Sequence, residues 1–276
     1  MKSHTQSPFN ARAAAQSSRG GGPHAPLGER LASSPSRATN VPRAWPAWAF
    51  PARANWRILL GPAVLVALGM CAFQLDAPLA SWLLAGNCPK PLMVVSDVTE
   101  SFGHGIGIAI IVAAIALVDA RGPRYAPRLL IAAWGGGMLA NLGKILVERP
   151  RPYRWAELGS PPILESFGEW LPLARNGSPL QSFPSAHSAC AIAFALTLAS
   201  IYPRGRWLFI SVAALVAMQR VIHGMHFASD VLVGAAIGWA TVVACRYGHL
   251  GMLLRYIEGD FLPGVDRPRA ALRQTP

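Results

Sequence analysis

Charged side chains and cysteines are both scarce in this sequence of 276 residues. Asp, Glu, Lys and Arg make up 14% of the chain and apolar residues 52%, a balance that argues against an ordinary soluble domain and favours a membrane protein. The four cysteines, Cys71, Cys88, Cys190 and Cys245, follow no metal-binding or redox spacing. Three of them sit in apolar runs, where cysteine packs as a small hydrophobe. The sequence therefore predicts neither a disulfide nor a zinc site.

Acidic residues are fewer than basic ones: 13 Asp and Glu against 25 Lys and Arg give a formal net charge of +12. Residues 1–57 hold eight of the basic residues but only one acid, Glu29. A basic arm ahead of an apolar run is more typical of the cytoplasmic flank of a membrane protein than of nucleic-acid binding, so we expect no nucleic-acid partner. The arm, residues 1–56, is rich in Ser, Ala, Arg, Pro and Gly and is predicted to be disordered; an organellar transit peptide is the alternative.

Apolar runs are the feature that the chain does have. Spanning the hydrocarbon core takes about 20 residues, with a range of about 17 to 25, and the runs reach that length when their polar end residues are counted. The six runs lie at 58–75, 102–118, 129–147, 187–203, 207–223 and 230–246. The sequence therefore predicts an all-α fold, a six-transmembrane helix bundle over residues 57–247.

Basic residues in the connections predict the orientation of these helices. If the arm is cytoplasmic, the outer connection 76–101 carries only Lys90, and the outer connection 148–186 balances four arginines with four glutamates. The inner connections and the tail hold Arg121, Arg124, Arg128, Arg204, Arg206, Arg246, Arg255, Arg267, Arg269 and Arg273. We therefore expect a multi-pass protein of a bacterial inner membrane with both termini in the cytoplasm. Residues 248–276 form its cytoplasmic tail, which begins either as a short interfacial helix or as a frayed segment.

One short stretch, residues 220–230 with the sequence RVIHGMHFASD, concentrates ionisable side chains between two apolar runs. Such side chains are costly at the edge of a membrane segment and indicate a functional site; a polar connection that faces water is the alternative. His226 and Asp230 are four residues apart, so on one helical turn the carboxylate can reach the imidazole and support a positive charge on it. Arg220 can hold an anion that His226 attacks, and Gly224 lets the backbone turn between them.

A second polar cluster falls on the same predicted side of the membrane. Lys144 and Arg151 are seven residues apart, which is two turns of a helix that Pro150 and Pro152 would end. The planar guanidinium of Arg151 suits phosphate, and Lys144 adds a point charge. A lysine that extends to the interface is the alternative for Lys144.

The third cluster opens the fourth apolar run. After Pro184, the residues Ser185, Ala186 and His187 present backbone N–H groups at a helix N-terminus, an arrangement that binds anions. His187 can donate a proton to a leaving oxygen; a water-bonded interfacial histidine is the alternative. Three cations and a helix N-terminus around one pocket predict a multiply charged anion such as a phosphate monoester or diphosphate. Because no carboxylate cluster suited to a hard metal accompanies them, we expect phosphoryl transfer without a metal or other cofactor.

Together, the three clusters resemble the signature of the type 2 phosphatidic acid phosphatases, a superfamily that also includes vanadium haloperoxidases and bacterial acid phosphatases. The resemblance covers residues 58–247 and is carried by Lys144-x6-Arg151-Pro152, Pro184-Ser185-Ala186-His187 and Arg220-x5-His226-x3-Asp230. It implies that His226 is a nucleophile that forms a phosphohistidine, that Asp230 orients it, and that His187 is the general acid. The phosphate-binding set that it implies is Lys144, Arg151, Ser185, Arg220 and the backbone N–H of Ala186.

Two positions depart from the family pattern. Ala186 stands where glycine is usual; it keeps the backbone N–H but excludes most conformations with positive φ. Gln219 stands where serine usually precedes the arginine, and the role of the replaced hydroxyl is not assigned. Neither change alters a charge, so we expect activity. His223 and His104 match no family position, and we interpret both as helix-end residues that face water or headgroups.

The resemblance implies an integral membrane lipid phosphatase with an extracytoplasmic site, where the headgroup of a phospholipid or prenyl (di)phosphate enters while its chains stay in the bilayer. One alternative is a phosphotransferase that passes the phosphoryl group to another lipid or sugar. A transporter or anion-binding protein is disfavoured, because transporter sites lie near the bilayer midplane between internal repeats. The sequence does not separate phosphatidic acid, phosphatidylglycerophosphate, undecaprenyl diphosphate and lipid A as substrates, and it sets no oligomeric state. The outer connection 153–183, with Trp155, Phe167 and Trp170, is a candidate cover that selects among them.

Overall fold

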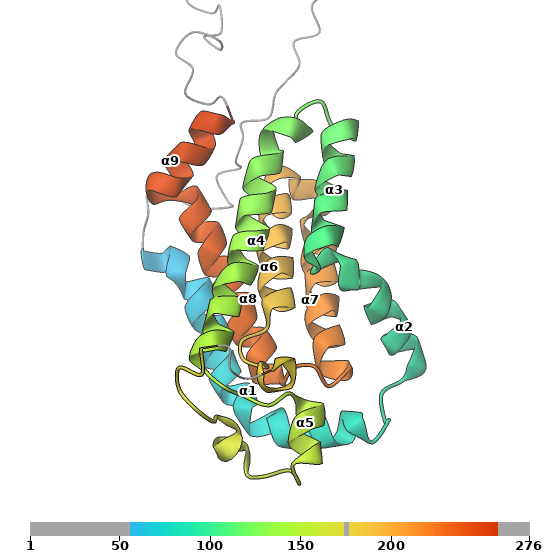
Figure 1. The fold of residues 1–276 in the computed structure, drawn as a ribbon. Coiled ribbons are helices and arrows are strands. Elements are labelled where there is room, and N and C mark those ends of the chain that lie inside the picture. Colours follow the sequence, from blue (N-terminus) through green and yellow to red (C-terminus); the bar gives the residue numbers. More distant parts are fainter. Residues whose placement is uncertain (1–55, 174–176, 259–276) are drawn as a thin grey trace, which may run out of the picture. The chain divides into compact units, whose positions relative to one another are not determined.

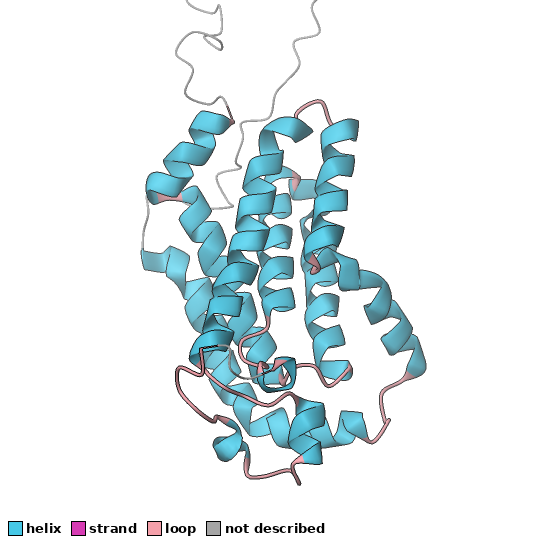
Figure 2. Ribbon diagram, in the orientation of Figure 1, coloured by secondary structure: helices cyan, strands magenta, loops and turns pink. Residues whose placement is uncertain are grey.

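The computed structural model describes residues 56–173 and 177–258. Within these ranges all regular secondary structure is helical, apart from two isolated bridges (Figure 2). The predicted all-α class is therefore confirmed for the described residues. The arm that we expect to be disordered, up to residue 55, and the tail beyond residue 258 lie outside them.

Six helices correspond to the six apolar runs. They are α1 (Leu60–Leu84), α3 (Gly105–Val118), α4 (Gly122–Leu146), α6 (Ala186–Ile201), α7 (Arg206–Ile222) and α8 (Ala228–Arg246). Three shorter α-helices are α2 (Lys90–Thr99), α5 (Pro152–Glu157) and α9 (Gly248–Ile257). Short 3-10 helices are Trp56–Leu59, Glu100–Phe102, Ile163–Ser166, Ser178–Leu180 and Pro203–Gly205. Much of the expected outer connection 76–101 is thus helical, and the tail begins as a helix rather than a frayed segment.

Four helical segments are long and apolar enough to cross a membrane: Trp56–Leu84, Gly122–Leu146, Pro203–Ile222 and Ala228–Arg246. A fifth is added if Lys90–Phe102 and Gly105–Val118, which are bent by 69° against each other, count as one span. The remaining apolar helix, α6, has 16 residues, fewer than the about 20 that a full span takes. Length and composition therefore support a multi-pass membrane protein, while the number of six spans and their orientation stay predictions.

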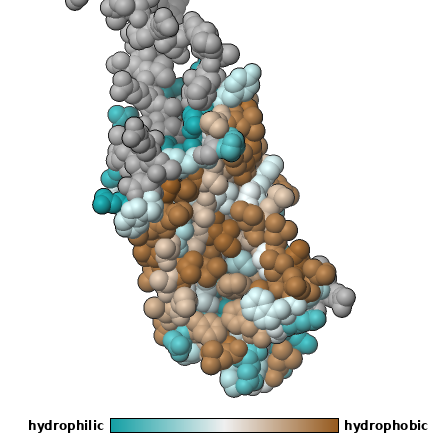
Figure 3. Space-filling view, turned by 90° about the vertical axis from the view of Figure 1, so that its left-hand side faces the viewer, coloured by the Kyte–Doolittle hydropathy of each residue, from teal (hydrophilic) through white to brown (hydrophobic). Residues whose placement is uncertain are grey.

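The helix α6 is the core of the bundle and packs against α4, α7 and α8 (Figure 1). It is rich in alanine, and eleven of its 16 residues are buried; a helix that is apolar around its whole circumference belongs inside a bundle. The outer faces are also apolar: Leu117 and Val118 on α3 are 88% exposed. Hydrophobic side chains likewise cover the middle of the face drawn in Figure 3. This is the surface expected of a bundle surrounded by lipid.

The three motifs lie at one end of the bundle, the lower end in Figure 1. There α4 ends, α6 begins, α7 ends and α8 begins, and the connection 147–185 with α5 crosses this end. The connections α3–α4 and α6–α7 lie at the opposite end. The predicted gathering of three distant stretches at one rim is therefore present in the fold.

Two glycines let α8 run against the start of α6. A Cβ atom at Gly234 would lie 2.3 Å from the carbonyl oxygen of Ser185, and one at Gly238 would lie 2.3 Å from the carbonyl oxygen of Ala189. These are backbone atoms that cannot rotate away. The four-residue spacing of the two glycines thus marks a close helix–helix contact, and this contact fixes the N-terminal turn of α6.

Replacing Gly234 by alanine is expected to force α6 and α8 apart and to reduce the free energy of unfolding by about 1–3 kcal/mol, as overpacking does. Thermal unfolding of the purified protein in detergent measures this. Gly135→Ala is the matched control, because a Cβ atom there meets the side-chain methyl of Thr241 at 3.4 Å, an ordinary contact. Equal stability of the two variants would contradict the packing that we describe.

Candidate active site

The first motif leaves its helix earlier than we expected. Lys144 lies in the last turn of α4, but the helix ends two residues later and Val147 is extended, with φ −138° and ψ 121°. The expectation that Lys144 and Arg151 project from one continuous helix is therefore wrong. Arg149 and Arg151 each precede a proline, and such residues disfavour the helical region; Arg151 has φ −68° and ψ 154°. The chain turns back across the bundle end instead.

The second motif builds the N-terminus of α6. The hydroxyl oxygen of Ser185 caps the helix by accepting from the N–H of Ser188 at 3.4 Å. The N–H of Ser185 donates to the carbonyl oxygen of Asp230 at 3.1 Å, so it is not among the free donors that we expected there. Ala186 and His187 occupy the first turn of α6, where N–H groups have no partner within the helix.

The third motif is a tight turn between α7 and α8. Gly224 has φ +63°, a conformation that glycine adopts without strain. The N–H of His226 donates to the carbonyl oxygen of Arg220 at 3.1 Å. This turn brings His226 back beside the end of α7 and leaves Asp230 in the first turn of α8.

His226 is buried, and its ring is held by a backbone carbonyl. Its Nδ1 lies 2.6 Å from the carbonyl oxygen of Ser182 but 3.9 Å from Oδ2 of Asp230. The expected direct contact between imidazole and carboxylate is thus longer than a hydrogen bond. A carbonyl oxygen can only accept, so Nδ1 carries the proton and the lone pair of the ring lies on Nε2.

The predicted cations act on His226 and on one another. Burial lowers the pKa of His226; the carboxylate of Asp230 opposes this shift, and the charges of Lys144 and Arg151 add to it. Burial also lowers the pKa of Arg151, and the nearby charge of Arg220 lowers it further. Lys144 and Arg151 thus act on the imidazole, which stays neutral at lower pH than an ordinary histidine, and Arg220 acts on Arg151.

His187 belongs to the same group of residues. It lies within electrostatic range of Arg220, His226 and Lys144. Its ring centroid is 5.9 Å from that of His104. His104, which we interpreted from the sequence as a helix-end residue, is therefore a neighbour of the predicted general acid.

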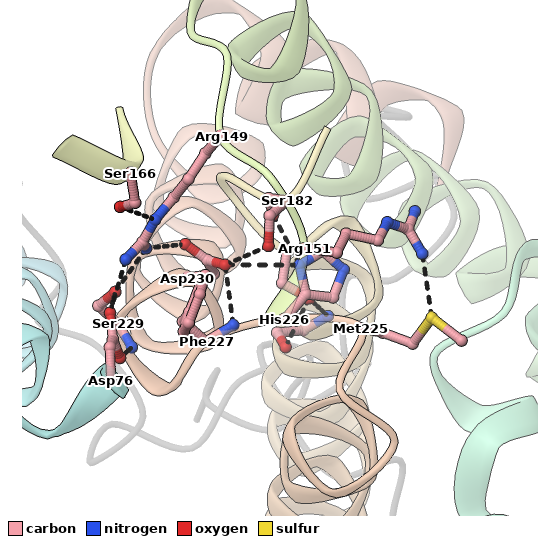
Figure 4. A network of polar contacts seen from close by, with 12 residues as sticks. Asp76, Arg149, Arg151, Ser166, Ser182, Met225, His226, Phe227, Ser229 and Asp230 are labelled. Atoms are coloured by element: carbon pink, nitrogen blue, oxygen red, sulfur yellow. Dashed lines mark hydrogen bonds and ion pairs between the residues drawn. The ribbon is translucent and has the colours of Figure 1, made fainter. Parts of the chain in front are cut away.

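Arg149 is the residue that the sequence analysis missed (Figure 4). Its guanidinium is fully buried and forms ion pairs with two carboxylates that are also fully buried: Nη2 lies 2.8 Å from Oδ2 of Asp76, and Nη1 contacts Oδ1 of Asp230. Nη1 also donates to the hydroxyl of Ser229 at 2.8 Å, and Nε donates to that of Ser166 at 3.2 Å. One arginine thus joins α1, α8 and the crossing connection.

Aromatic rings enclose this arginine. Its guanidinium carbon lies 4.3 Å, 4.6 Å and 5.2 Å from the ring centroids of Phe227, Phe167 and Phe73, within the range of cation–π attraction. The sequence did hold one signal for this site. Asp76 directly follows the first apolar run and lies in α1. A carboxylate in such a segment is costly unless it is paired, so it indicated a buried cation.

Asp230 reaches His226 through Ser182. Its Oδ2 accepts from the hydroxyl of Ser182 at 2.6 Å and from the N–H of Phe227 at 2.9 Å. The backbone carbonyl of the same serine accepts a hydrogen bond from Nδ1 of His226. The carboxylate of Asp230 and the imidazole of His226 are therefore both bound to Ser182. Asp230 and His226 are thus linked indirectly, and the family expectation that Asp230 orients the histidine stays a prediction.

Arg220 is paired as well, but with an exposed acid. Its Nη2 lies 2.6 Å from Oε1 of Glu100, whose side chain is 42% exposed, and its Nε donates to Oε1 of Gln219 at 2.5 Å. The Nη1 of Arg151 has only the thioether of Met225 at 3.1 Å, and its Nε is buried without a hydrogen-bond partner among the described residues. In the described ranges no group of three His, Cys, Asp or Glu residues is placed to hold a metal ion.

Asp76→Asn is expected to lower the free energy of unfolding by about 3–5 kcal/mol, because removal of one partner leaves a buried charge undercompensated. Thermal unfolding in detergent measures the loss. Glu157→Gln is the control, since its ion pair with Arg154 is exposed and is worth about 1 kcal/mol at most. A loss in Asp76→Asn as small as in the control would show that Arg149 does not need both carboxylates.

Comparison with known proteins finds similar sequences, one solved structure and one family. Two relatives are each named lipid A 1-phosphatase. The protein from Rhizobium etli is 28% identical over 74% of this chain and 93% of its own length, and the one from Rhizobium johnstonii is 29% identical over 69% and 80%. A crystal structure of a phosphatidylglycerolphosphate phosphatase from Bacillus subtilis aligns with 74% of this chain and 98% of its own, at 16% identity and a TM-score of 0.43. Residues 126–251 match the PAP2 superfamily.

Proposed function

We propose that this protein is a membrane lipid phosphatase that hydrolyses a lipid phosphate through a phosphohistidine on His226, without a metal ion. The observation that carries the proposal is the geometry of His226. Its Nδ1 is bound to a backbone carbonyl, so Nε2 has the lone pair, and Lys144 and Arg151 act on the same ring. A neutral nucleophile surrounded by cations suits attack on a phosphate anion.

The chemistry follows from these positions. Nε2 of His226 attacks phosphorus while the bond from phosphorus to the leaving oxygen breaks, and protonated His187 gives its proton to that oxygen. The lipid alcohol leaves. Water then attacks the phosphohistidine and passes a proton to His187, the N–P bond breaks, and inorganic phosphate is released. The negative charge that spreads over the phosphoryl oxygens faces Lys144, Arg151 and Arg220, which supply the electrostatic stabilisation that metal ions supply elsewhere.

The proposed site faces the extracytoplasmic side. Four arginines lie in or beside the connections at the other end of the bundle: Arg121, Arg124, Arg204 and Arg206. An excess of basic residues marks cytoplasmic connections. In this orientation a headgroup enters the rim from the outer leaflet while its chains remain beside the apolar helix faces.

The substrate that we propose is a lipid of the lipid A type. Both relatives that align over most of their length carry the name lipid A 1-phosphatase, and the cation set suits a terminal phosphate monoester. In the connection 153–183, Phe167 and Trp155 pack inward against Phe73 and Phe227, while Trp170 is 73% exposed. Of Trp155, Phe167 and Trp170, Trp170 is therefore the one that is free to touch a bound lipid.

In detergent and EDTA, the purified protein is expected to release inorganic phosphate from lipid A faster than from phosphatidic acid, phosphatidylglycerophosphate or undecaprenyl diphosphate. His226→Ala is expected to reduce release to background, because it removes the nucleophile. Acid-labile phosphate trapped on the wild type but not on the variant identifies the intermediate. An active His226→Ala variant would exclude this mechanism, and transfer of labelled phosphate to a lipid or sugar would favour the phosphotransferase alternative.

The assignment of His187 is tested by the leaving group. His187→Ala is expected to lower kcat by about 10²–10⁴-fold with a lipid substrate, the usual contribution of general acid catalysis. With p-nitrophenyl phosphate, whose leaving oxygen needs no proton, the loss is expected to shrink to a few-fold. Equal losses with both substrates would assign His187 to binding rather than to proton donation.

A further inference from the structure

The segment before α3 carries two exposed acids that contact the end of α7. Asp97 lies in α2, and Glu100 begins the 3-10 helix that follows it. Oδ1 of Asp97 lies 2.6 Å from Nε2 of His223 and accepts from Nε2 of Gln219 at 3.3 Å. Oε1 of Glu100 lies 2.6 Å from Nη2 of Arg220. The family resemblance accounts for none of these acids.

The side chain of Gln219 links the two contacts. Its Nε2 donates to Asp97, and its Oε1 accepts from Nε of Arg220 at 2.5 Å. Gln219 is buried, so its amide has a fixed orientation. A serine, the usual residue at this position in the resembled family, is too short to span both partners. The glutamine therefore ties the guanidinium of Arg220 to α2.

Gln219 and Glu100, the two residues that contact the guanidinium of Arg220, differ in the free energy that is needed to separate them from it. Gln219 is 3% exposed, so breaking its hydrogen bond to Arg220 would leave a buried polar atom without a partner. The carboxylate of Glu100 is 42% exposed and can return to water at little cost. An incoming phosphate dianion can thus displace Glu100 from Arg220, while the amide of Gln219 keeps the guanidinium in place.

We propose that Glu100 competes with the substrate's phosphate for Arg220, and that Gln219, anchored by Asp97, is the positioning residue that holds Arg220 during the exchange. The inference rests on the proposed function, because it takes Arg220 as a phosphate ligand. Glu100 thereby sets how tightly the site holds anions. It weakens the binding of phosphate, both as substrate headgroup and as product.

Glu100→Gln tests the competition, because it keeps the shape of the side chain and removes its charge. The variant is expected to bind inorganic phosphate about threefold to tenfold more tightly than the wild type, as measured by calorimetry in detergent, a range that fits the loss of one partly exposed charged rival. KM for the lipid is expected to fall by a similar factor. Glu157→Gln, the same charge change in a pair that does not touch the site, is the matched control and is expected to leave both values unchanged.

Gln219→Met tests whether Gln219 positions Arg220, and it is expected to weaken phosphate binding, whereas Glu100→Gln strengthens it. It keeps the length of the side chain but removes both hydrogen bonds, so phosphate affinity is expected to fall and KM to rise about threefold to tenfold, with a smaller change in kcat and an unchanged melting temperature. A purely structural role would instead lower the melting temperature and kcat together.

Phosphate affinity in Glu100→Gln that equals or falls below the wild-type value overturns the inference, as does an absence of phosphate binding in every variant. The proposed function fails separately: if wild type releases no phosphate from any lipid but the variants still shift phosphate affinity in the two expected directions, the competition stands and the hydrolase assignment falls.

Discussion

The constraint on which the rest of the structure depends is the burial of one arginine between two carboxylates. Arg149, Asp76 and Asp230 are each fully buried, and a charge in such a place is stable only when its hydrogen-bonding capacity is filled. A guanidinium has five N–H donors in a fixed plane. It can therefore donate to both carboxylates and both serine hydroxyls only when α1, α8 and the crossing connection are held in one relative position. The network therefore specifies how these three elements meet.

Two further contacts link this network to His226, the histidine that we propose to react. Asp230 holds the hydroxyl of Ser182, and the carbonyl of the same residue holds the imidazole of His226. Ser185, three residues later, donates its N–H to the carbonyl oxygen of Asp230 in α8, and its own carbonyl oxygen faces Gly234. The orientation of the imidazole and the place of the α6 N-terminus thus follow from the same contact between α6 and α8. An error in that packing would misplace His226, the proposed nucleophile, and the proposed anion site together.

The sequence predicted the features that depend on local patterns. The apolar runs located six helices to within a few residues of their ends, because hydrophobic length is a local property. The exceptions are α1, which continues to Leu84, and α4, which begins at Gly122. Motif spacing and alternation of ends placed Lys144, His187 and His226 at one end of the bundle. What it could not give were contacts between distant residues. Nothing near Arg149 in the chain shows that Asp76, 73 positions earlier, will meet it. The seven-residue spacing of Lys144 and Arg151 suggested one continuous helix, whereas the prolines after Arg149 and Arg151 favour an extended backbone.

Two arginines at the same end of the bundle illustrate how burial, rather than charge, divides structural from functional roles. Arg149 and Arg220 each pair with carboxylates, but the partners of Arg149 have no access to water, whereas Glu100 is 42% exposed. Separating a buried pair strands two desolvated charges, so no substrate can displace the acids of Arg149. An exposed carboxylate regains its hydration when it leaves. Arg220 is therefore the one of these two arginines that can exchange its resident acid for the phosphate of the proposed substrate, although both residues have the same chemistry.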